Sequence, residues 1–330
     1  MSSNRKNNKS NIKKYSWIAI VLAIVVMALN AFLSQQGNPL PEEITDAAET
    51  VLQESLQGDT PNTDVGDSAS AAPLPQPVVA ETTSTPVPES ASFDTSDFYN
   101  PAAEFDYYVL ALSWQPAFCE MRSDKLECAS QTAARFDATN FVLHGLWPNQ
   151  NNDPNHTFGY CDVSQNQIQM DKEGDWCDLP ALQLSTGVTQ RLDEAMPGKQ
   201  SCLQNHEWYK HGACSGLSAE AYYDVSTQLV QSFAQTNFNQ YIAANVGKMV
   251  DRNAVLEQFA AEFGAGTQDY LSVRCSEVDG VDVLTEIQIT LKKDLSTPDD
   301  WSSLFPDNPP RINGSCPGQF KIDAVGLGNL

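Results

Sequence analysis

Histidines are the residues of this chain best suited to acid–base chemistry near neutral pH, because the unperturbed imidazole titrates there. The sequence contains four, which are His144, His156, His206 and His211. A single histidine is usually structural. Three of these four, however, lie in two short motifs rich in aromatic and charged residues, 144–148 (HGLWP) and 206–214 (HEWYKHGAC). We interpret these three as catalytic candidates and His156 as a loop residue.

The second motif gathers four polar groups on one side of a helix, if residues 206–212 are helical. Successive residues turn by about 100°, so His206, Lys210, Glu207 and His211 lie at about 0°, 40°, 100° and 140° around the axis. Two imidazoles, an ammonium group and a carboxylate then face the same space. A solvated helix face is the alternative interpretation, but such a face would rarely collect both histidines.

The second motif begins with His-Glu at 206–207, as zinc-protease motifs do. Those motifs need two histidine ligands four residues apart, with the glutamate between them. Here the histidines are five residues apart, and the cationic Lys210 occupies the required position. The eight cysteines form no CxxC pair of the kind that holds structural zinc. The sequence therefore predicts no metal site, and we expect no cofactor.

Histidines with a carboxylate and an ammonium group suit the cleavage of a phosphodiester whose nucleophile is internal. One imidazole can accept a proton while another donates one. A cation and a third imidazole can bind the phosphate and stabilise its developing charge. The ribose 2′-OH is such a nucleophile, and DNA lacks it. The pattern therefore predicts cleavage of RNA.

Both motifs, in this order, resemble the two active-site segments of the ribonuclease T2 family. With 111–115 (ALSWQ) and the cysteine layout, the resemblance extends over roughly residues 104–325. It implies that His211 is the general base for the 2′-OH, that His144 is the general acid for the leaving 5′-oxygen and that His206 binds the phosphate. Glu207 and Lys210 would stabilise the pentavalent transition state.

The resemblance also implies the products and leaves two other functions open. The first product would be a 2′,3′-cyclic phosphate, which the same groups then hydrolyse to a 3′-phosphate. Ala213 stands where the family often has Thr, and we interpret this difference as packing. One alternative is a catalytically inactive member of the fold that binds RNA or a partner, and the other is an anchored structural or adhesion protein. The intact motifs speak against the inactive member.

The residues that bind the base are less defined than the catalytic ones. Trp147 is a candidate stacking platform, because aromatic stacking tolerates any base. It could instead pack beneath the turn that carries His144. Asn149 is expected to border the same pocket. We therefore expect an endonuclease of low base specificity that acts on single-stranded RNA.

All eight cysteines lie after residue 118. The basic residues near the N-terminus and the uncharged stretch at 17–33 that follows them resemble an export signal. An even number of cysteines after such a signal predicts disulfides formed in an oxidising compartment. Eight cysteines allow 105 complete pairings, and the sequence alone does not choose among them. The family resemblance implies the pairs Cys119–Cys128, Cys161–Cys214, Cys177–Cys202 and Cys275–Cys316.

The elements that must position these residues are of mixed type. Segments 105–113, 139–147, 269–274 and 284–291 have the composition or alternation of strands. Segments 218–236 and 253–263 have apolar residues at helical spacing. Strands and helices follow no regular βαβ rhythm, which predicts an α+β fold. We expect a central antiparallel sheet, flanked by helices and stapled by disulfides.

The N-terminal third differs in composition from the remainder. Five basic residues precede an uncharged stretch at 17–33, which is just long enough to span a membrane. We predict a cytoplasmic basic segment at 1–16, a transmembrane signal anchor at 17–33, an acidic disordered linker at 34–103 and a ribonuclease domain at 104–330. The positive-inside rule places that domain on the periplasmic or extracellular side, anchored to the inner membrane. A cleaved signal peptide is the alternative. We expect a monomer, with RNA and the membrane as partners.

The charge of the chain argues against broad electrostatic binding of RNA. The formal net charge is −23, and from Glu104 onward 30 acidic and 14 basic residues leave −16. Nucleic-acid-binding surfaces are usually basic. We therefore expect RNA to be held by local contacts from Lys210, protonated histidine and stacking.

Overall fold

The structure is a computed structural model, and it describes residues 95–153, 158–308 and 313–328. The predicted cytoplasmic segment 1–16, the signal anchor 17–33, most of the linker 34–103 and His156 lie outside these residues. Within the described ranges, no helix combines the length and the apolar character needed to cross a membrane.

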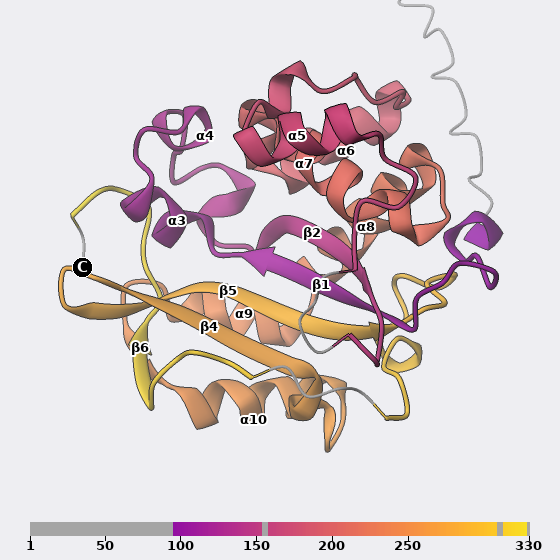
Figure 1. The fold of residues 1–330 in the computed structure, drawn as a ribbon. Coiled ribbons are helices and arrows are strands. Elements are labelled where there is room, and N and C mark those ends of the chain that lie inside the picture. The colour runs from indigo at the N-terminus through magenta and orange to yellow at the C-terminus, as the bar shows by residue number, and fades with distance from the viewer. Residues whose placement is uncertain (1–94, 154–157, 309–312, 329–330) are drawn as a thin grey trace, which may run out of the picture. The chain divides into compact units, whose positions relative to one another are not determined.

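A six-stranded sheet forms the centre of the fold, with the order β2-β1-β5-β6-β3 and with β4 paired to β5 beside this path (Figure 1). The pairs β1–β2, β1–β5, β4–β5 and β3–β6 are antiparallel. Among the strand pairs in the described residues, only the short contact between β5 and β6 is parallel. The predicted α+β class is confirmed. The strands are β1 (Tyr107–Ser113), β2 (Val142–Asn149), β3 (Met249–Asp251), β4 (Leu271–Val278), β5 (Val281–Lys292) and β6 (Gln319–Lys321).

Helices lie on both sides of this sheet. Figure 1 shows α5, α6, α7 and α8 together beside β2 and β1, and α10 on the opposite side near β4 and β6. The helices are α3 (Gln115–Met121), α4 (Leu126–Ala129), α5 (Gln165–Glu173), α6 (Thr186–Ala195), α7 (Leu203–Lys210), α8 (Ala219–Ala234), α9 (Asn237–Ala244) and α10 (Arg252–Phe263). Short 3-10 helices are η1 (Thr95–Phe98), η2 (Phe136–Ala138), η3 (Trp176–Asp178), η4 (Pro197–Ser201), η5 (Gly212–Ser215), η6 (Thr267–Tyr270) and η7 (Trp301–Ser303).

Helix α8 shows why the periodic segments form helices. The Ser218 hydroxyl accepts a hydrogen bond from the backbone N–H of Ala221 and so caps the first turn. The apolar residues spaced three to four apart, from Tyr222 to Phe233, are buried in the main core. Burial of this stripe against the sheet supplies most of the stability of such a helix. The predicted helix at 218–236 is thus confirmed to within two residues.

The folded part of the chain begins before the predicted boundary at residue 104. Phe98 in η1 is fully buried in the hydrophobic core. The side-chain amide of Asn100 donates to the carbonyl of Gly216 at 3.0 Å. Composition does not indicate that this segment is folded, because only one aromatic residue, Phe98, attaches it to the core. Phe98 and Asn100 therefore pack on the domain, and the linker at 34–103 stays a prediction.

Four disulfides join the pairs that the family resemblance implies, which are Cys119–Cys128, Cys161–Cys214, Cys177–Cys202 and Cys275–Cys316. Two of them bracket α7. Cys202 is the residue immediately before this helix, and Cys214 lies in η5, immediately after it. The segment that carries HEWYKH is therefore tied to the rest of the fold at both ends.

Candidate active site

His144 projects from a break in the register of β2. Ala111 of β1 pairs with Gly145, but the next residue, Leu112, pairs with Leu143. His144 is thus the extra residue of a β-bulge. Bulges bend a strand and re-aim a side chain, and they are common beside active sites. The bulge explains how an imidazole in the middle of a buried strand keeps 34% of its side chain exposed.

Glu286 on β5 holds the His144 ring. The Nδ1 atom of His144 lies 2.6 Å from Oε2 of Glu286, and because a carboxylate only accepts, Nδ1 is the donor. Burial works against protonation of His144. The hydrogen bond to Glu286, with the negative charges of Glu207 and Glu286, outweighs that effect and raises the pKa of His144 to about 9. At neutral pH His144 is therefore cationic.

Glu207 on α7 is buried beneath the histidines, with 1% of its side chain exposed. Its Oε2 accepts a hydrogen bond from the indole N–H of Trp147 at 2.7 Å. Its Oε1 has no hydrogen-bond partner and lies 3.5 Å from Nε2 of His144 and 3.8 Å from Nε2 of His206. A buried carboxylate oxygen left open between two imidazoles indicates a functional role rather than a structural one.

Gly145 makes room for this arrangement. A Cβ atom at Gly145 would lie 2.0 Å from Oε2 of Glu207 and 2.3 Å from Nε1 of Trp147. No rearrangement of either side chain alone would relieve both clashes. The glycine of the HGLWP motif is therefore required because the carboxylate and the indole approach the strand so closely.

His206 is fixed by residues of α5 and η3. Its Nδ1 lies 2.8 Å from Oδ1 of Asp171, whose other oxygen accepts from the Tyr160 hydroxyl at 2.7 Å. The indole of Trp176 stacks on the imidazole at a centroid distance of 4.5 Å. Nδ1 is therefore occupied, and Nε2 is directed towards Glu207.

His211 follows the last residue of α7 as its C-cap, with φ −119° and ψ −54°. Its ring lies 5.2 Å from that of Trp147, and the His144 ring lies 5.3 Å from the same indole. Burial first, and then the positive charges of Lys210 and the other two histidines, lower the pKa of His211 to about 2. At pH 7 His211 is therefore a neutral imidazole, whereas His144 is protonated.

The helical expectation for HEWYKH needs one correction. The helix ends at Lys210, so His211 lies beyond the last helical residue and its direction does not follow from a 100° step. The four polar groups still come close together, because the C-cap turn directs His211 towards Trp147. Lys210 contributes a positive charge that acts on both His144 and His211. Trp208 of the same helix packs against the hydrophobic core.

The two predicted base-binding residues lie differently. Trp147 is half-buried and contacts the rings of His144 and His211, and its indole N–H donates to Glu207. Asn149 is 8% exposed at the end of β2, where its side-chain amide donates to the carbonyl of Trp147. The structure thus brings Trp147 into contact with the catalytic histidines, whereas Asn149 is buried and bonded to the Trp147 backbone.

Three residues of the site were not predicted, namely Glu286, Asp171 and Trp176. Glu286 had a weak signal, since it is the charged residue in the alternating segment 284–291. Asp171 and Trp176 gave no signal, because they belong to a polar helix and a short 3-10 helix. Only the fold brings these three beside the histidines. In the described part of the chain, no group of three or more His, Cys, Asp or Glu is arranged to hold a metal ion.

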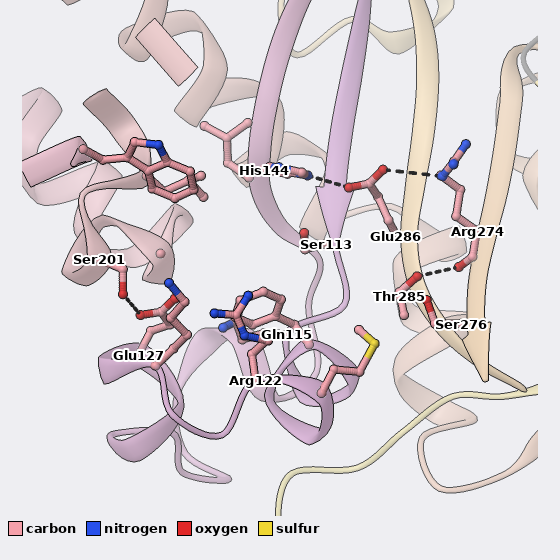
Figure 2. A pocket seen from close by; sticks show the side chains of 17 residues that line it. Ser113, Gln115, Arg122, Glu127, His144, Ser201, Arg274, Ser276, Thr285 and Glu286 are labelled. Atoms are coloured by element: carbon pink, nitrogen blue, oxygen red, sulfur yellow. Dashed lines mark hydrogen bonds and ion pairs between the residues drawn. The ribbon is translucent and has the colours of Figure 1, made fainter. Parts of the chain in front are cut away.

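A cavity of about 340 Å³ opens beside His144 and Glu286. Figure 2 shows the line of contacts from His144 through Glu286 to Arg274, whose Nε lies 4.0 Å from Oε1 of Glu286. On one wall of the pocket, the Ser201 hydroxyl donates to the carboxylate of Glu127 (Figure 2). Substrate can therefore reach His144 from this cavity.

Two imidazoles with opposite pKa shifts, both in contact with the same indole ring, suit the cleavage of a phosphodiester that carries its own nucleophile. Together with the disulfide-stapled α+β fold, they define an acid–base ribonuclease. The ribonuclease T2 family model matches residues 105–300, and the chain belongs to this family. It is accordingly an RNA endonuclease.

Two curated relatives illustrate the relationship. Ribonuclease I of Escherichia coli is 32% identical over 240 residues, which cover 68% of this chain and 88% of the relative. A ribonuclease of Aeromonas hydrophila is 33% identical over 137 residues, which cover 39% of this chain and 47% of that protein. Among solved structures, a mutant of RNase MC1 in complex with 5′-GMP covers 66% of this chain and all of its own, with 20% identity and a TM-score of 0.46.

Proposed function

We propose that this endoribonuclease cleaves RNA with His211 as the general base and His144 as the general acid. The opposite pKa shifts of the two imidazoles are the observation that carries the proposal. A neutral imidazole can take the proton of the ribose 2′-OH, and a protonated imidazole can donate a proton to the leaving 5′-oxygen. The 2′-oxygen bonds to phosphorus as the P–O5′ bond breaks, which leaves a 2′,3′-cyclic phosphate.

The other polar groups act on the phosphate between these two residues. His206, whose Nδ1 is held by Asp171, directs Nε2 towards the reaction centre and binds a phosphate oxygen. Lys210 adds positive charge where the pentavalent phosphorane gains negative charge. Glu207 lies within 4 Å of both His144 and His206, and its negative charge favours the protonated form of His144. Hydrolysis of the cyclic phosphate to a 3′-phosphate follows with the roles of His144 and His211 reversed.

Trp147 and Glu286 act as positioning residues in this scheme. The indole N–H fixes Glu207, and the Glu286 carboxylate fixes the His144 ring and its charge. The half-exposed indole of Trp147 remains our candidate for stacking on a base, which is consistent with low base specificity on single-stranded RNA. Asn149 supports it by holding the end of β2.

We further propose that the enzyme is an exported monomer. Four disulfides within the described part support an oxidising compartment. The basic residues before the apolar stretch 17–33 support an N-terminal anchor in the inner membrane. N-terminal sequencing of the mature protein separates an anchor, which leaves residues 1–33 in place, from a cleaved signal peptide, which removes them.

The test of the mechanism uses the full chain and an RNA oligonucleotide. His144→Ala and His211→Ala should each abolish cleavage, whereas excess EDTA should leave the wild type active. A substrate with a 2′-deoxyribose at the cleaved position should resist all forms of the enzyme, and mass spectrometry should detect the 2′,3′-cyclic phosphate. Inhibition by EDTA, or cleavage at the deoxyribose, would refute the proposal.

A further inference from the structure

The cavity beside His144 collects positive charge in a chain that has little of it. Arg122, Lys125 and Arg274 all line it, together with the carboxylates of Glu127 and Glu286. Only 14 basic residues occur from Glu104 onward, and the net charge there is −16. Apolar side chains, among them Trp176 and Leu203, form other walls. A concave site with apolar walls and a few charged groups is typical of a small-ligand subsite.

The residues around the cavity indicate which part of the substrate it faces. His144 and Glu286 line it, whereas His206, Glu207 and His211 do not. If His144 protonates the leaving 5′-oxygen, the nucleotide that departs lies on the His144 side. The cavity therefore faces the leaving nucleotide, and this step rests on the proposed function.

The three cations differ in their partners. Arg274 lies 4.0 Å from the Glu286 carboxylate, so its charge is matched within the site. Arg122 contacts Asp124 at 3.3 Å, but both side chains are at least half exposed, and such a pair is weak. The Lys125 ammonium group lies 5.9 Å from the centre of the Trp176 ring, a contact that does not neutralise its charge. Arg122 and Lys125 are thus able to accept an anionic ligand.

Arg122 and Lys125 also lie on the side of the cavity away from the reacting groups. They come from the segment between α3 and α4, whereas His144 and Glu286 come from the sheet. Figure 2 shows Arg122 and Glu127 well apart from His144, with the cavity between them. An RNA strand that places its 5′-oxygen at His144 therefore carries its next phosphate towards this segment.

We propose that Arg122 and Lys125 bind the phosphate that follows the leaving nucleotide. The enzyme then prefers RNA chains that continue beyond the leaving nucleotide to dinucleotides that end there with a free 3′-OH. Exposed ion pairs each contribute a factor of roughly two to five in affinity, so the two cations together provide roughly four- to 25-fold. This subsite accounts for RNA binding by an acidic protein through a few local contacts.

The experiment compares three substrates with the full-length enzyme: UpA, UpAp with a 3′-terminal phosphate, and pUpA with a 5′-terminal phosphate. The last two carry an added phosphate on opposite sides of the cleaved bond. For the wild type, kcat/KM for UpAp should exceed that for UpA by roughly four- to 25-fold. In the double variant Arg122→Gln, Lys125→Gln this ratio should approach one. The matched control Lys248→Gln removes one exposed positive charge at a distance from the site and should keep the wild-type ratio.

Three outcomes would overturn the subsite. They are a wild-type ratio near one, a ratio that the double variant leaves unchanged, and an equal effect of the double variant on pUpA and UpAp. The last outcome would mean general attraction of anions. Failure of the wild type to cleave either UpA or long RNA would instead refute the proposed function itself, so the two failures are distinguishable.

Discussion

Replacing Glu286 with Gln should shift the basic limb of the pH profile of kcat/KM to lower pH. Glutamine keeps the size of the side chain and an oxygen that can accept from Nδ1 of His144, but it removes the negative charge. The His144 pKa of about 9 results from burial, which lowers it, and from the larger combined effect of the Glu286 hydrogen bond and of the Glu207 and Glu286 charges, which raise it. The substitution therefore weakens a raising effect, and the pKa must fall.

The size of the shift follows from the strength of the bond. A hydrogen bond to a charged group contributes about 1.5–3 kcal/mol and a neutral one about 0.5–1.5 kcal/mol. The difference, reduced because one-third of the His144 side chain is exposed, leaves about 1 kcal/mol, or slightly under one pKa unit. With a pKa of about 8.3 in place of 9, the protonated fraction at pH 9.5 falls roughly fourfold. At pH 6 both enzymes have protonated His144, and kcat/KM should be nearly equal.

The assay is cleavage of a fluorogenic RNA oligonucleotide between pH 5 and 10 at constant ionic strength. Glu277→Gln, which removes an exposed carboxylate from the neighbouring strand β4, is the matched control and should leave the basic limb in place. A Glu286→Gln enzyme with an unshifted basic limb would contradict the assignment of Glu286 as the residue that holds His144 protonated. A uniform loss of activity at every pH would also contradict it, since that result indicates a purely structural role.

Other substitutions probe the remaining parts of the site. Gly145→Ala should reduce kcat at least tenfold, because the added Cβ would lie 2.0 Å from Oε2 of Glu207, whereas Gly318→Ala, where the new Cβ meets open space, should be neutral in the same assay. Serine in place of both Cys161 and Cys214 opens a loop of 53 residues, which should cost about 4 kcal/mol of the free energy of unfolding; unchanged stability and activity would contradict the role of this bond in holding the catalytic segment. Because the pKa of His211 is depressed, the unfolded chain gains a proton there below about pH 6.5 while the folded chain does not. The free energy of unfolding should therefore fall between about pH 6 and pH 4 more steeply in the wild type than in His211→Ala, and parallel curves would exclude a depressed pKa.

Local patterns were sufficient to predict the elements but not the contacts between them. The apolar residues along 218–236 predict a helix because they are spaced by one helical turn. The alternation at 284–291 predicts a strand because successive side chains of a strand point to opposite faces. The bulge at His144 has no sequence signal, since it depends on how two strands pair. Nor does the sequence show that Glu286, 142 residues away, is the partner of His144.

The spacing of polar residues in HEWYKH predicts part of the site's geometry and misses another part. It correctly groups His206, Glu207 and Lys210, which are within α7. It assigns His211 a direction that the C-cap turn changes, because the helix ends one residue earlier. Asp171 holds His206 from a different helix, and that contact exists only once α5 packs against α7.

The assignment of acid and base is tested most directly with a substrate whose leaving 5′-oxygen is replaced by sulfur. A thiolate needs no general acid, because thiols ionise near pH 8.5 whereas alcohols do so far higher. On this 5′-thio substrate, His144→Ala should regain cleavage to within about tenfold of the wild type, while His211→Ala should stay inactive for want of a base. Recovery of His211→Ala in place of His144→Ala, or of neither variant, would contradict the proposed roles of the two histidines.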